Sequence, residues 1–140
     1  MKEKEKLTIL VDDREGVDLV TPLTKLGVEC MITRLSCGDY VCGDVVIERK
    51  TISDFCLSII DGRLINQVEK MKEAFKHKYI LISGKITEKE SEINEKCVLG
   101  KIVSLVIKHK INVLLFDNDN QVSWVIKRIF ERHQEICDEK

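Results

Sequence analysis

The sequence predicts an α/β domain in which a mixed sheet carries helices on both of its faces, a three-layer arrangement. Short apolar runs typical of buried strands alternate along the chain with stretches that have helical periodicity. Alternation of this kind is typical of sheets that helices cover on both sides. The chain has 140 residues, a length that fits one domain, so we expect a single unit over residues 1–140.

In the first half of the chain, apolar runs of strand length are separated by glycines and polar turn residues. Leu7–Val11 is such a run, and it ends in the polar residues 12–16. Gly27 follows a stretch with helical spacing and is expected to end that helix. A turn around Gly43 joins two short runs and predicts a β-hairpin. The expected elements are a strand over 7–11, a helix over 17–26, a strand over 28–35, and hairpin arms over 38–41 and 45–50.

Helical periodicity dominates the second half of the chain. Thr51 and Asp54 resemble a capping box with Asp in place of the usual Glu or Gln, so a helix is expected to begin there. Asp61-Gly62 breaks that helix and can cap the next one. Residues 85–96 are polar and acidic, and we expect a loop there that is a candidate for disorder. The remaining elements are helices on the apolar stripes 52–60 and 64–75, strands over 79–82 and 111–116, and helices over 97–109 and 122–136.

The charge balance and the cysteine pattern exclude several classes of protein. Basic residues number 23 and acidic residues 24, so any nucleic-acid contact must come from a local basic patch. No apolar run is long enough for a signal peptide or a bilayer span. We therefore expect an intracellular protein without membrane contact, cytoplasmic if its source is archaeal and nuclear if it is eukaryotic. The 6 cysteines form no C-x-x-C pair, so no zinc site is expected and the thiols are predicted to be buried.

The stretch from residue 39 to residue 54 carries the candidate chemistry. Glu48 and Lys50 lie two apart on a predicted strand and point to the same face, while Arg49 points to the other. Asp39 lies on the preceding arm of the hairpin, near enough to face Glu48. Two carboxylates can hold Mg²⁺, and a neighbouring lysine can orient a water for phosphodiester hydrolysis. The spacing by itself leaves open the alternative of a solvated strand end without a metal.

These residues also carry a resemblance to the XPF/Hef family of structure-specific endonucleases. Residues 38–39 (G-D), the triplet 48–50 (E-R-K) and Asp54 are similar to the family's GD-x(n)-ERK-x(3)-D signature. Residues 11–15 (V-D-D-R-E) resemble its V-D-x-R-E block, and residues 59–67 resemble its I-I-D-G-R-L-x-x-Q segment. The three blocks stand in the order of the family, and the similarity covers nearly the entire chain.

The resemblance implies a restriction-endonuclease-like fold and the hydrolysis of branched DNA (flaps, forks and bubbles) near the junction between duplex and single strands. Mg²⁺ or Mn²⁺ is the implied cofactor. On motif position, Asp39 and Glu48 are implied as metal ligands, with Asp12 as a third acidic ligand. Lys50 is implied to position the attacking water.

Two further signature residues, Arg49 and Asp54, are implied to belong to the catalytic set. Because Arg49 points away from Glu48, two interpretations stay open for it. It could touch DNA, or it could bind Asp54 or Glu15 in a structural ion pair. Arg14 matches the V-D-x-R-E block and is implied as a DNA contact.

The helix that begins near residue 63 offers a face for DNA. Arg63, Gln67 and Lys70 share one side of this helix, largely opposite to its apolar stripe. A row of this kind can follow a phosphate backbone, and an ordinary solvated face is the alternative. The resemblance favours DNA contact, because Arg63 and Gln67 match family positions.

Two alternatives to a flap- or fork-cleaving endonuclease stay open: a non-catalytic DNA-binding or scaffold subunit, and a junction resolvase of the same broad fold. Asp39, Glu48 and Lys50 together argue against the subunit, because clustered carboxylates repel one another unless a cation intervenes. The resemblance implies a single nuclease domain over 1–140. The helix-hairpin-helix module and the helicase domain of other family members are not expected in this chain.

The two C-terminal helices, expected over 97–109 and 122–136, are apolar around more than one face. A monomer would leave part of that surface exposed, so the sequence predicts a homodimer through these helices. The resemblance adds a heterodimer with a related subunit as a second possibility. Burial of both helices within one chain is the alternative. Charged replacements such as Ile129→Glu or Phe130→Glu are expected to convert the dimer to a monomer or to prevent folding altogether.

Overall fold

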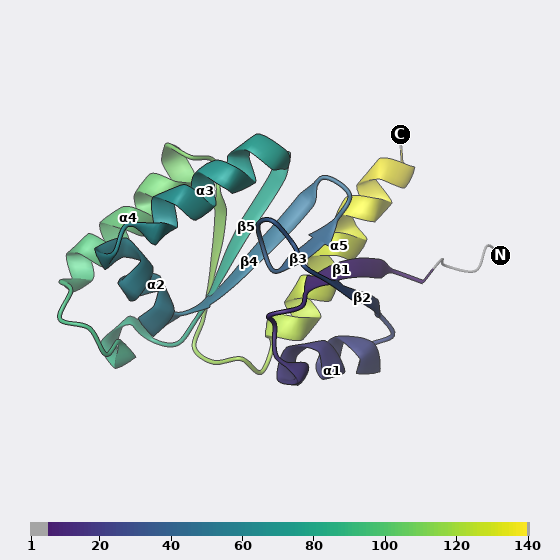
Figure 1. Cartoon of the computed structure of the whole chain (residues 1–140), viewed down its shortest axis with the longest axis horizontal. Coiled ribbons are helices and arrows are strands. Elements are labelled where there is room, and N and C mark those ends of the chain that lie inside the picture. Colours follow the sequence, from purple (N-terminus) through teal and green to yellow (C-terminus); the bar gives the residue numbers. More distant parts are fainter. Residues whose placement is uncertain (1–5, 140) are drawn as a thin grey trace.

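A mixed sheet of six strands crosses the part of the chain that the structure describes, residues 6–139 of a computed structural model (Figure 1). The strand order is β2-β1-β3-β4-β5-β6. Strand β3 pairs antiparallel with β1 and β4, while the pairs β1–β2, β4–β5 and β5–β6 are parallel. The strands are β1 (Thr8–Asp12), β2 (Glu29–Thr33), β3 (Tyr40–Cys42), β4 (Val45–Thr51), β5 (His77–Ser83) and β6 (Asn112–Phe116).

Helices cover both faces of this sheet, as the alternation of strands and helices predicts. Helices α1 (Val17–Lys25) and α5 (Val122–Asp138) pack on one face. Helices α2 (Ile52–Ile60), α3 (Arg63–Ala74) and α4 (Glu95–Ile107) pack on the other. The two layers lie on opposite sides of the strands in Figure 1. The predicted three-layer α/β domain is therefore confirmed.

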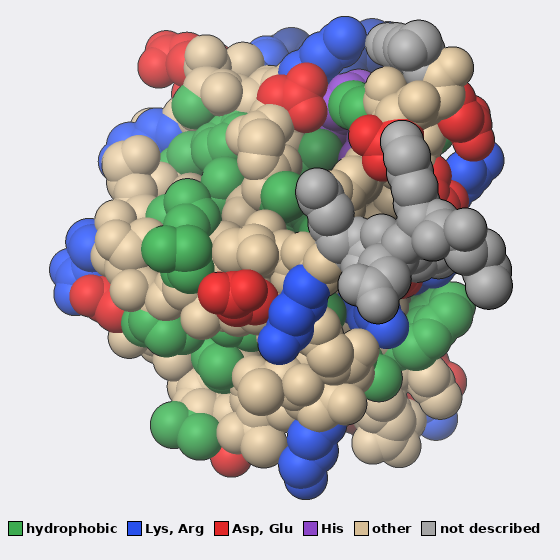
Figure 2. All heavy atoms as spheres, turned by 90° about the vertical axis from the view of Figure 1, so that its right-hand side faces the viewer, with side chains coloured by type: hydrophobic (Ala, Val, Ile, Leu, Met, Phe, Trp, Pro, Cys, Tyr) green, Lys and Arg blue, Asp and Glu red, His purple; other side chains and the backbone are tan. Residues whose placement is uncertain are grey.

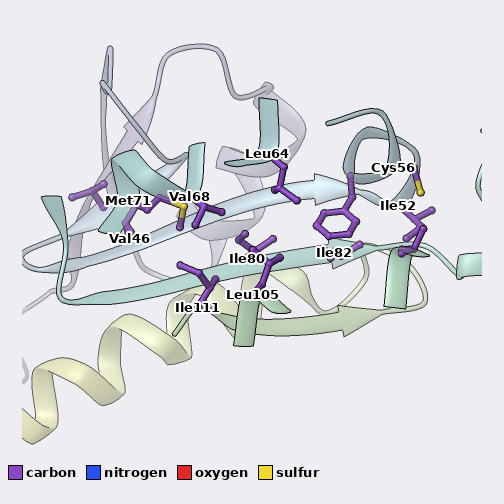
Figure 3. Close-up of a cluster of buried hydrophobic side chains, with 13 residues drawn as sticks. Val46, Ile52, Cys56, Leu64, Val68, Met71, Ile80, Ile82, Leu105 and Ile111 are labelled. Atoms are coloured by element: carbon purple, nitrogen blue, oxygen red, sulfur yellow. The ribbon is translucent and has the colours of Figure 1, made fainter. Parts of the chain in front are cut away.

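The central strand β4 contributes to both cores because its residues alternate between the two faces. Val46 packs in the cluster under α2, α3 and α4, whereas Ile47 packs in the cluster under α1 and α5. Figure 3 shows Leu64 and Val68 of α3 pointing toward the strand side chains in the first cluster. This packing fixes α3 over the face to which Glu48, two residues after Val46, also belongs.

Local signals set several element boundaries as the sequence predicts. The Oγ1 of Thr51 accepts a hydrogen bond of 3.1 Å from the backbone N–H of Asp54, which confirms the N-cap of α2. Gly62, with φ of 78°, separates α2 from α3. Gly38 also has a positive φ of 78°, and a Cβ there would clash with Cγ2 of Val46. Only glycine fits that position, directly before Asp39.

Two predicted segments differ from the structure. The strand expected over 28–35 ends at Thr33, because the backbone N–H of Leu35 turns toward the Asp12 carboxylate. Residues 85–96, expected as a loop and a candidate for disorder, contain a 3₁₀ turn at Ile86–Glu88. Ile86 and Ile93 of this segment pack against the core. Two apolar side chains therefore anchor a segment whose composition is mostly polar.

The prediction that the cysteine thiols are buried is only partly correct. Cys56 is buried, Cys30, Cys37 and Cys42 are half-buried, and Cys97 and Cys137 are exposed. All of them are free thiols. In residues 6–139, no helix has the length and the apolar composition needed to cross a membrane.

The C-terminal helices have a core side and an exposed apolar side, as the width of their stripes predicts. Val98 and Leu105 of α4 and Val122, Ile126 and Phe130 of α5 are buried. Phe130 is only 1% exposed, so of the two outcomes predicted for a charge at this position, failure to fold is the one that its burial favours. Apolar side chains that stay exposed on and between these helices are Leu99, Val103, Val106, Ile107, Leu114, Leu115, Trp124 and Ile136.

Candidate active site

Acidic residues meet at one end of the neighbouring strands β1, β3 and β4: Asp12 ends β1, Asp39 directly precedes β3 and Glu48 lies in β4. The N–H of Asp39 donates to the carbonyl of Ile47 at 2.9 Å, which holds Asp39 beside β4, where the negative charge of Glu48 acts on its carboxylate. The N–H of Asp12, at the end of β1, donates to the carbonyl of Asp39 at 2.9 Å. The predicted juxtaposition of Asp39 and Glu48 is therefore present, with Asp12 beside it.

Lys50 lies on the same side of β4 as Glu48, as strand geometry predicts. Its Nζ is 3.7 Å from Oε1 of Glu48, and the two side chains are only 7% and 12% exposed. A charged pair this deeply buried needs further polar partners to be stable. The site thus holds one buried cation beside two carboxylates.

Burial and neighbouring negative charges disfavour the ionisation of both Asp39 and Glu48. Burial and the negative charge of Glu48 raise the pKa of Asp39. Burial also raises the pKa of Glu48, although the neighbouring Lys50 lowers it. Glu15 accepts a hydrogen bond of 2.7 Å from the Tyr40 hydroxyl, and its negative charge raises the pKa of both Asp39 and Glu48. A cation between Asp39 and Glu48 would remove the repulsion.

This pair fits the ligand requirement of Mg²⁺ or Mn²⁺. These ions take oxygen ligands, and Mg²⁺ is commonly held by one or two protein carboxylates together with waters and phosphate oxygens. Among the described residues, no group of three His, Cys, Asp or Glu side chains is placed to hold a metal ion. Asp39 and Glu48 offer carboxylate oxygens for such an ion, with Asp12 beside them.

Asp12, expected as a third ligand, has both carboxylate oxygens engaged by other donors. Oδ2 accepts from Nε of Arg14 at 2.7 Å, and Oδ1 accepts from an Arg14 terminal nitrogen at 3.1 Å and from Leu35 N–H at 2.9 Å. The Arg14 guanidinium holds the pKa of Asp12 below its usual value. In this arrangement Asp12 orients Arg14, while its negative charge also acts on the nearby Glu48 carboxylate.

Arg49 has a partner that neither predicted interpretation includes. Its guanidinium forms an ion pair with Asp119, in the turn between β6 and α5. Asp54 lies exposed in the first turn of α2, and Glu15 binds Tyr40, so the expected pairing of Arg49 with either residue is wrong. No local sequence pattern singles out Asp119, because its position in a polar turn is typical of solvated residues.

The basic face of α3 lies next to the acidic pair. Cys37 is close to both the Glu48 carboxylate and the Lys70 ammonium: burial raises the pKa of its thiol, Glu48 raises it further and Lys70 lowers it. Lys70 is exposed, and Arg63 is exposed and bound to Asp61 at 2.6 Å. Gln67 differs from the expected solvated row, because its Oε1 is buried without a hydrogen-bond partner.

Comparison with known proteins finds relatives over nearly the entire chain. The sequence profile of the ERCC4 domain matches residues 11–129. The 3'-flap repair endonuclease Xpf of Saccharolobus solfataricus is 30% identical over 136 residues, which cover 91% of this chain and 56% of that protein. The putative ATP-dependent RNA helicase MJ1505 of Methanocaldococcus jannaschii is 32% identical over 132 residues, covering 94% of this chain and 16% of that protein.

Solved structures agree with these sequence relatives. XPF from Aeropyrum pernix superposes with a TM-score of 0.84 at 26% identity, covering 91% of this chain and 65% of that one. The complex of the A. pernix protein with DNA gives a TM-score of 0.85 at 26% identity, covering 93% and 66%. The chain thus spans about two thirds of these solved chains and 56% of the S. solfataricus protein. Because the family profile matches most of its length, this chain belongs to the ERCC4 domain family, and its resemblance to the XPF/Hef nucleases and its restriction-endonuclease-like fold are confirmed.

Proposed function

We propose that this chain is a Mg²⁺- or Mn²⁺-dependent endonuclease that hydrolyses phosphodiester bonds in branched DNA near the junction of duplex and single strands. The observation that carries the proposal is the facing pair Asp39 and Glu48 with Lys50 buried beside it. The name of the S. solfataricus relative, a 3'-flap repair endonuclease, and the DNA complex of the A. pernix protein favour a DNA substrate with a flap or fork.

Asp39 and Glu48 would hold the metal ion through their carboxylate oxygens. When bound, the ion lowers the pKa of a coordinated water and neutralises charge on the phosphate. Lys50 keeps a positive charge next to these oxygens and can donate a hydrogen bond to the attacking water or to a phosphate oxygen. Arg14, fixed by Asp12 and 59% exposed, is available to a DNA phosphate at the rim.

Cleavage of a substrate panel separates this proposal from its alternatives. In Mg²⁺, we expect cuts in flap and fork substrates near the junction and little cleavage of linear duplex, with no cleavage in EDTA. Preference for a four-way junction would instead favour a junction resolvase. DNA binding without cleavage in either metal would favour a non-catalytic DNA-binding or scaffold subunit.

The exposed basic residues of α3 are the proposed track for the DNA backbone. In the view of Figure 2, the end of the molecule that carries the C-terminus of α5 mixes basic, acidic and apolar side chains. Lys70 lies near Cys37 and Glu48, and Arg63 is on the same helix, which covers the face of the sheet to which Glu48 belongs. DNA held there would bring a phosphate to Lys50.

Arg63→Ala and Lys70→Ala are each expected to weaken fork binding equally for different base sequences. Each change removes one phosphate contact, so the slope of log K against log[salt] should fall in magnitude by about 1. Fluorescence anisotropy over a salt series measures both quantities. Lys25→Ala, on α1 at the opposite face, is the matched control and should leave the slope unchanged. A loss of base preference with an unaltered slope would contradict a backbone contact.

We propose further that the chain forms a homodimer, or a heterodimer with a related subunit, through the β6 end of the sheet. Strand β6 is an edge strand of the described sheet, and Leu115 on it is 60% exposed. On α4, Val103 and Ile107 are 60% and 65% exposed. On α5, Trp124 and Ile136 line an open groove of about 320 Å³. Apolar surface of this extent at an unpaired edge favours a protein partner.

Ile107→Glu and Leu115→Glu are expected to convert the dimer to a monomer of 16.1 kDa while the domain stays folded. Both side chains lie outside the core, so a charge costs little in the monomer but is desolvated in the interface. Light scattering with circular dichroism tests this. Val17→Glu, a change of a 77% exposed side chain on α1, is the control. A monomeric unmodified chain at micromolar concentration would contradict the homodimer.

A further inference from the structure

Arg49 stands between two residues of the proposed site, yet its side chain belongs to the opposite layer. Tyr40 and Ile47 are paired across the hairpin and pack under α1 and α5, and Arg49, two residues after Ile47, points to that same face. The Arg49 side chain is only 12% exposed. A guanidinium this deeply buried needs a partner of opposite charge.

Asp119 supplies that partner from a distant part of the chain. Its Oδ1 pairs with a terminal nitrogen of Arg49, whereas Nε of Arg49 is buried without a hydrogen bond. Hydrogen bonds constrain the turn that carries Asp119. The carbonyl of Asp119 accepts from the N–H of Val122, at the start of α5, at 3.2 Å. Oδ1 of Asn118 accepts from the N–H of Asn120 at 2.9 Å. The ion pair therefore joins β4 to a constrained turn.

The main chain of Arg49 touches the metal-binding pair directly. Its backbone N–H donates a hydrogen bond of 2.7 Å to Oδ2 of Asp39. The orientation of the Asp39 carboxylate toward Glu48 thus depends on where the Arg49 peptide lies. Tyr40 on the same face donates to Glu15, so Glu15 is an acidic group within the neighbourhood of the Arg49 side chain.

We propose that Asp119 is a positioning residue for the active site, an inference that rests on the proposed function. By anchoring the Arg49 guanidinium on the α1/α5 side, Asp119 holds the Arg49 peptide in the place from which its N–H binds Asp39. Without Asp119, the buried guanidinium lacks its counter-ion and moves, and the end of β4 moves with it. The Arg49 N–H then no longer fixes the Asp39 carboxylate in the orientation that the divalent cation requires.

Divalent-cation binding in the absence of DNA tests the proposal apart from catalysis. Calorimetric titration with Ca²⁺, a hard cation with oxygen ligands, is expected to show about tenfold weaker binding for Asp119→Asn, since partners that orient metal ligands typically contribute 10–100-fold in affinity. Asp119→Glu keeps the charge and should recover most of the affinity. Asp117→Asn, in the same turn, is the matched control and should bind as the unmodified chain does.

Cleavage kinetics give a second readout. For Asp119→Asn, kcat on forked DNA should fall and the Mg²⁺ concentration for half-maximal rate should rise about tenfold, with KM for DNA unchanged. If Asp119 acts through Arg49, the double variant Arg49→Ala/Asp119→Asn binds Ca²⁺ no more weakly than Arg49→Ala alone.

The outcomes separate this inference from the proposed function. An Asp119→Asn variant that melts at a lower temperature but binds Ca²⁺ and responds to Mg²⁺ like the unmodified chain would show a purely structural ion pair and overturn the inference. An unmodified chain that binds Ca²⁺ but cleaves no DNA would refute the proposed function alone, with the role of Asp119 decided by the titration. An unmodified chain that binds no Ca²⁺ would overturn both.

Discussion

Glu48→Gln is expected to abolish cleavage of forked DNA, with a rate loss of about 10³-fold or more, because metal-ion catalysis is worth several kcal/mol in the transition state. The change keeps the side-chain volume and removes the negative charge that a divalent cation requires. Asp39→Asn should have the same effect, and its amide oxygen can still accept from Arg49 N–H, as the Asp39 carboxylate does. Gel assays of fork cleavage in Mg²⁺ measure the loss.

A folding control distinguishes this loss from damage to the domain. Burial raises the pKa of Glu48 above its unfolded value, so the folded state binds the proton more tightly than the unfolded state does. Its contribution to stability is therefore greatest at acid pH and falls as pH rises from the unfolded pKa through the folded pKa. In EDTA at pH 8, Glu48→Gln should melt at or above the temperature of the unmodified chain, and this advantage should shrink at pH 5.

Cleavage and melting together test whether Asp39 and Glu48 are the metal ligands. A Glu48→Gln or Asp39→Asn variant that cuts a fork at a rate near that of the unmodified chain in Mg²⁺ would exclude this pair as the metal ligands. An inactive variant that also melts at a much lower temperature would point to a structural role. Only loss of cleavage with retained stability agrees with the proposal.

Lys50→Ala is expected to lower kcat by about 10²-fold with little change in fork affinity, because a preorganised positive charge acts on the phosphate mainly in the transition state. The Lys50 side chain is buried, and its Nζ lies 3.7 Å from Oε1 of Glu48. Lys50 is therefore placed to act on groups bound at the site and not on bulk solvent. Single-turnover kinetics on a fork give the rate, and anisotropy gives the affinity. Lys70→Ala is the comparison and should show the reverse pattern, weaker binding with a preserved single-turnover rate. An unaltered rate for Lys50→Ala would remove Lys50 from the mechanism.

Local sequence determined how Asp39, Glu48 and Lys50 are placed relative to one another. The period of two along β4 places Glu48 and Lys50 on one face and Arg49 on the other, since adjacent side chains in a strand point to opposite sides. The glycine at position 38 and the short turn after β3 bring Asp39 opposite Glu48, because hairpin register follows from turn length. Thr51 caps α2 through a contact three residues away. Each of these features depends only on neighbours in the chain.

Only the tertiary structure decided which charges meet. Both carboxylate oxygens of Asp12 accept hydrogen bonds, from Arg14 and from the backbone of Leu35. Arg49 on β4 pairs with Asp119 because the β6–α5 turn packs close to the Arg49 side chain. An ion pair between residues distant in sequence forms where the fold brings their charged groups within a few ångströms of one another. No local sequence pattern encodes that proximity. The same holds for Phe130 and Leu115: both are apolar, and packing against the sheet buries one while the edge position exposes the other.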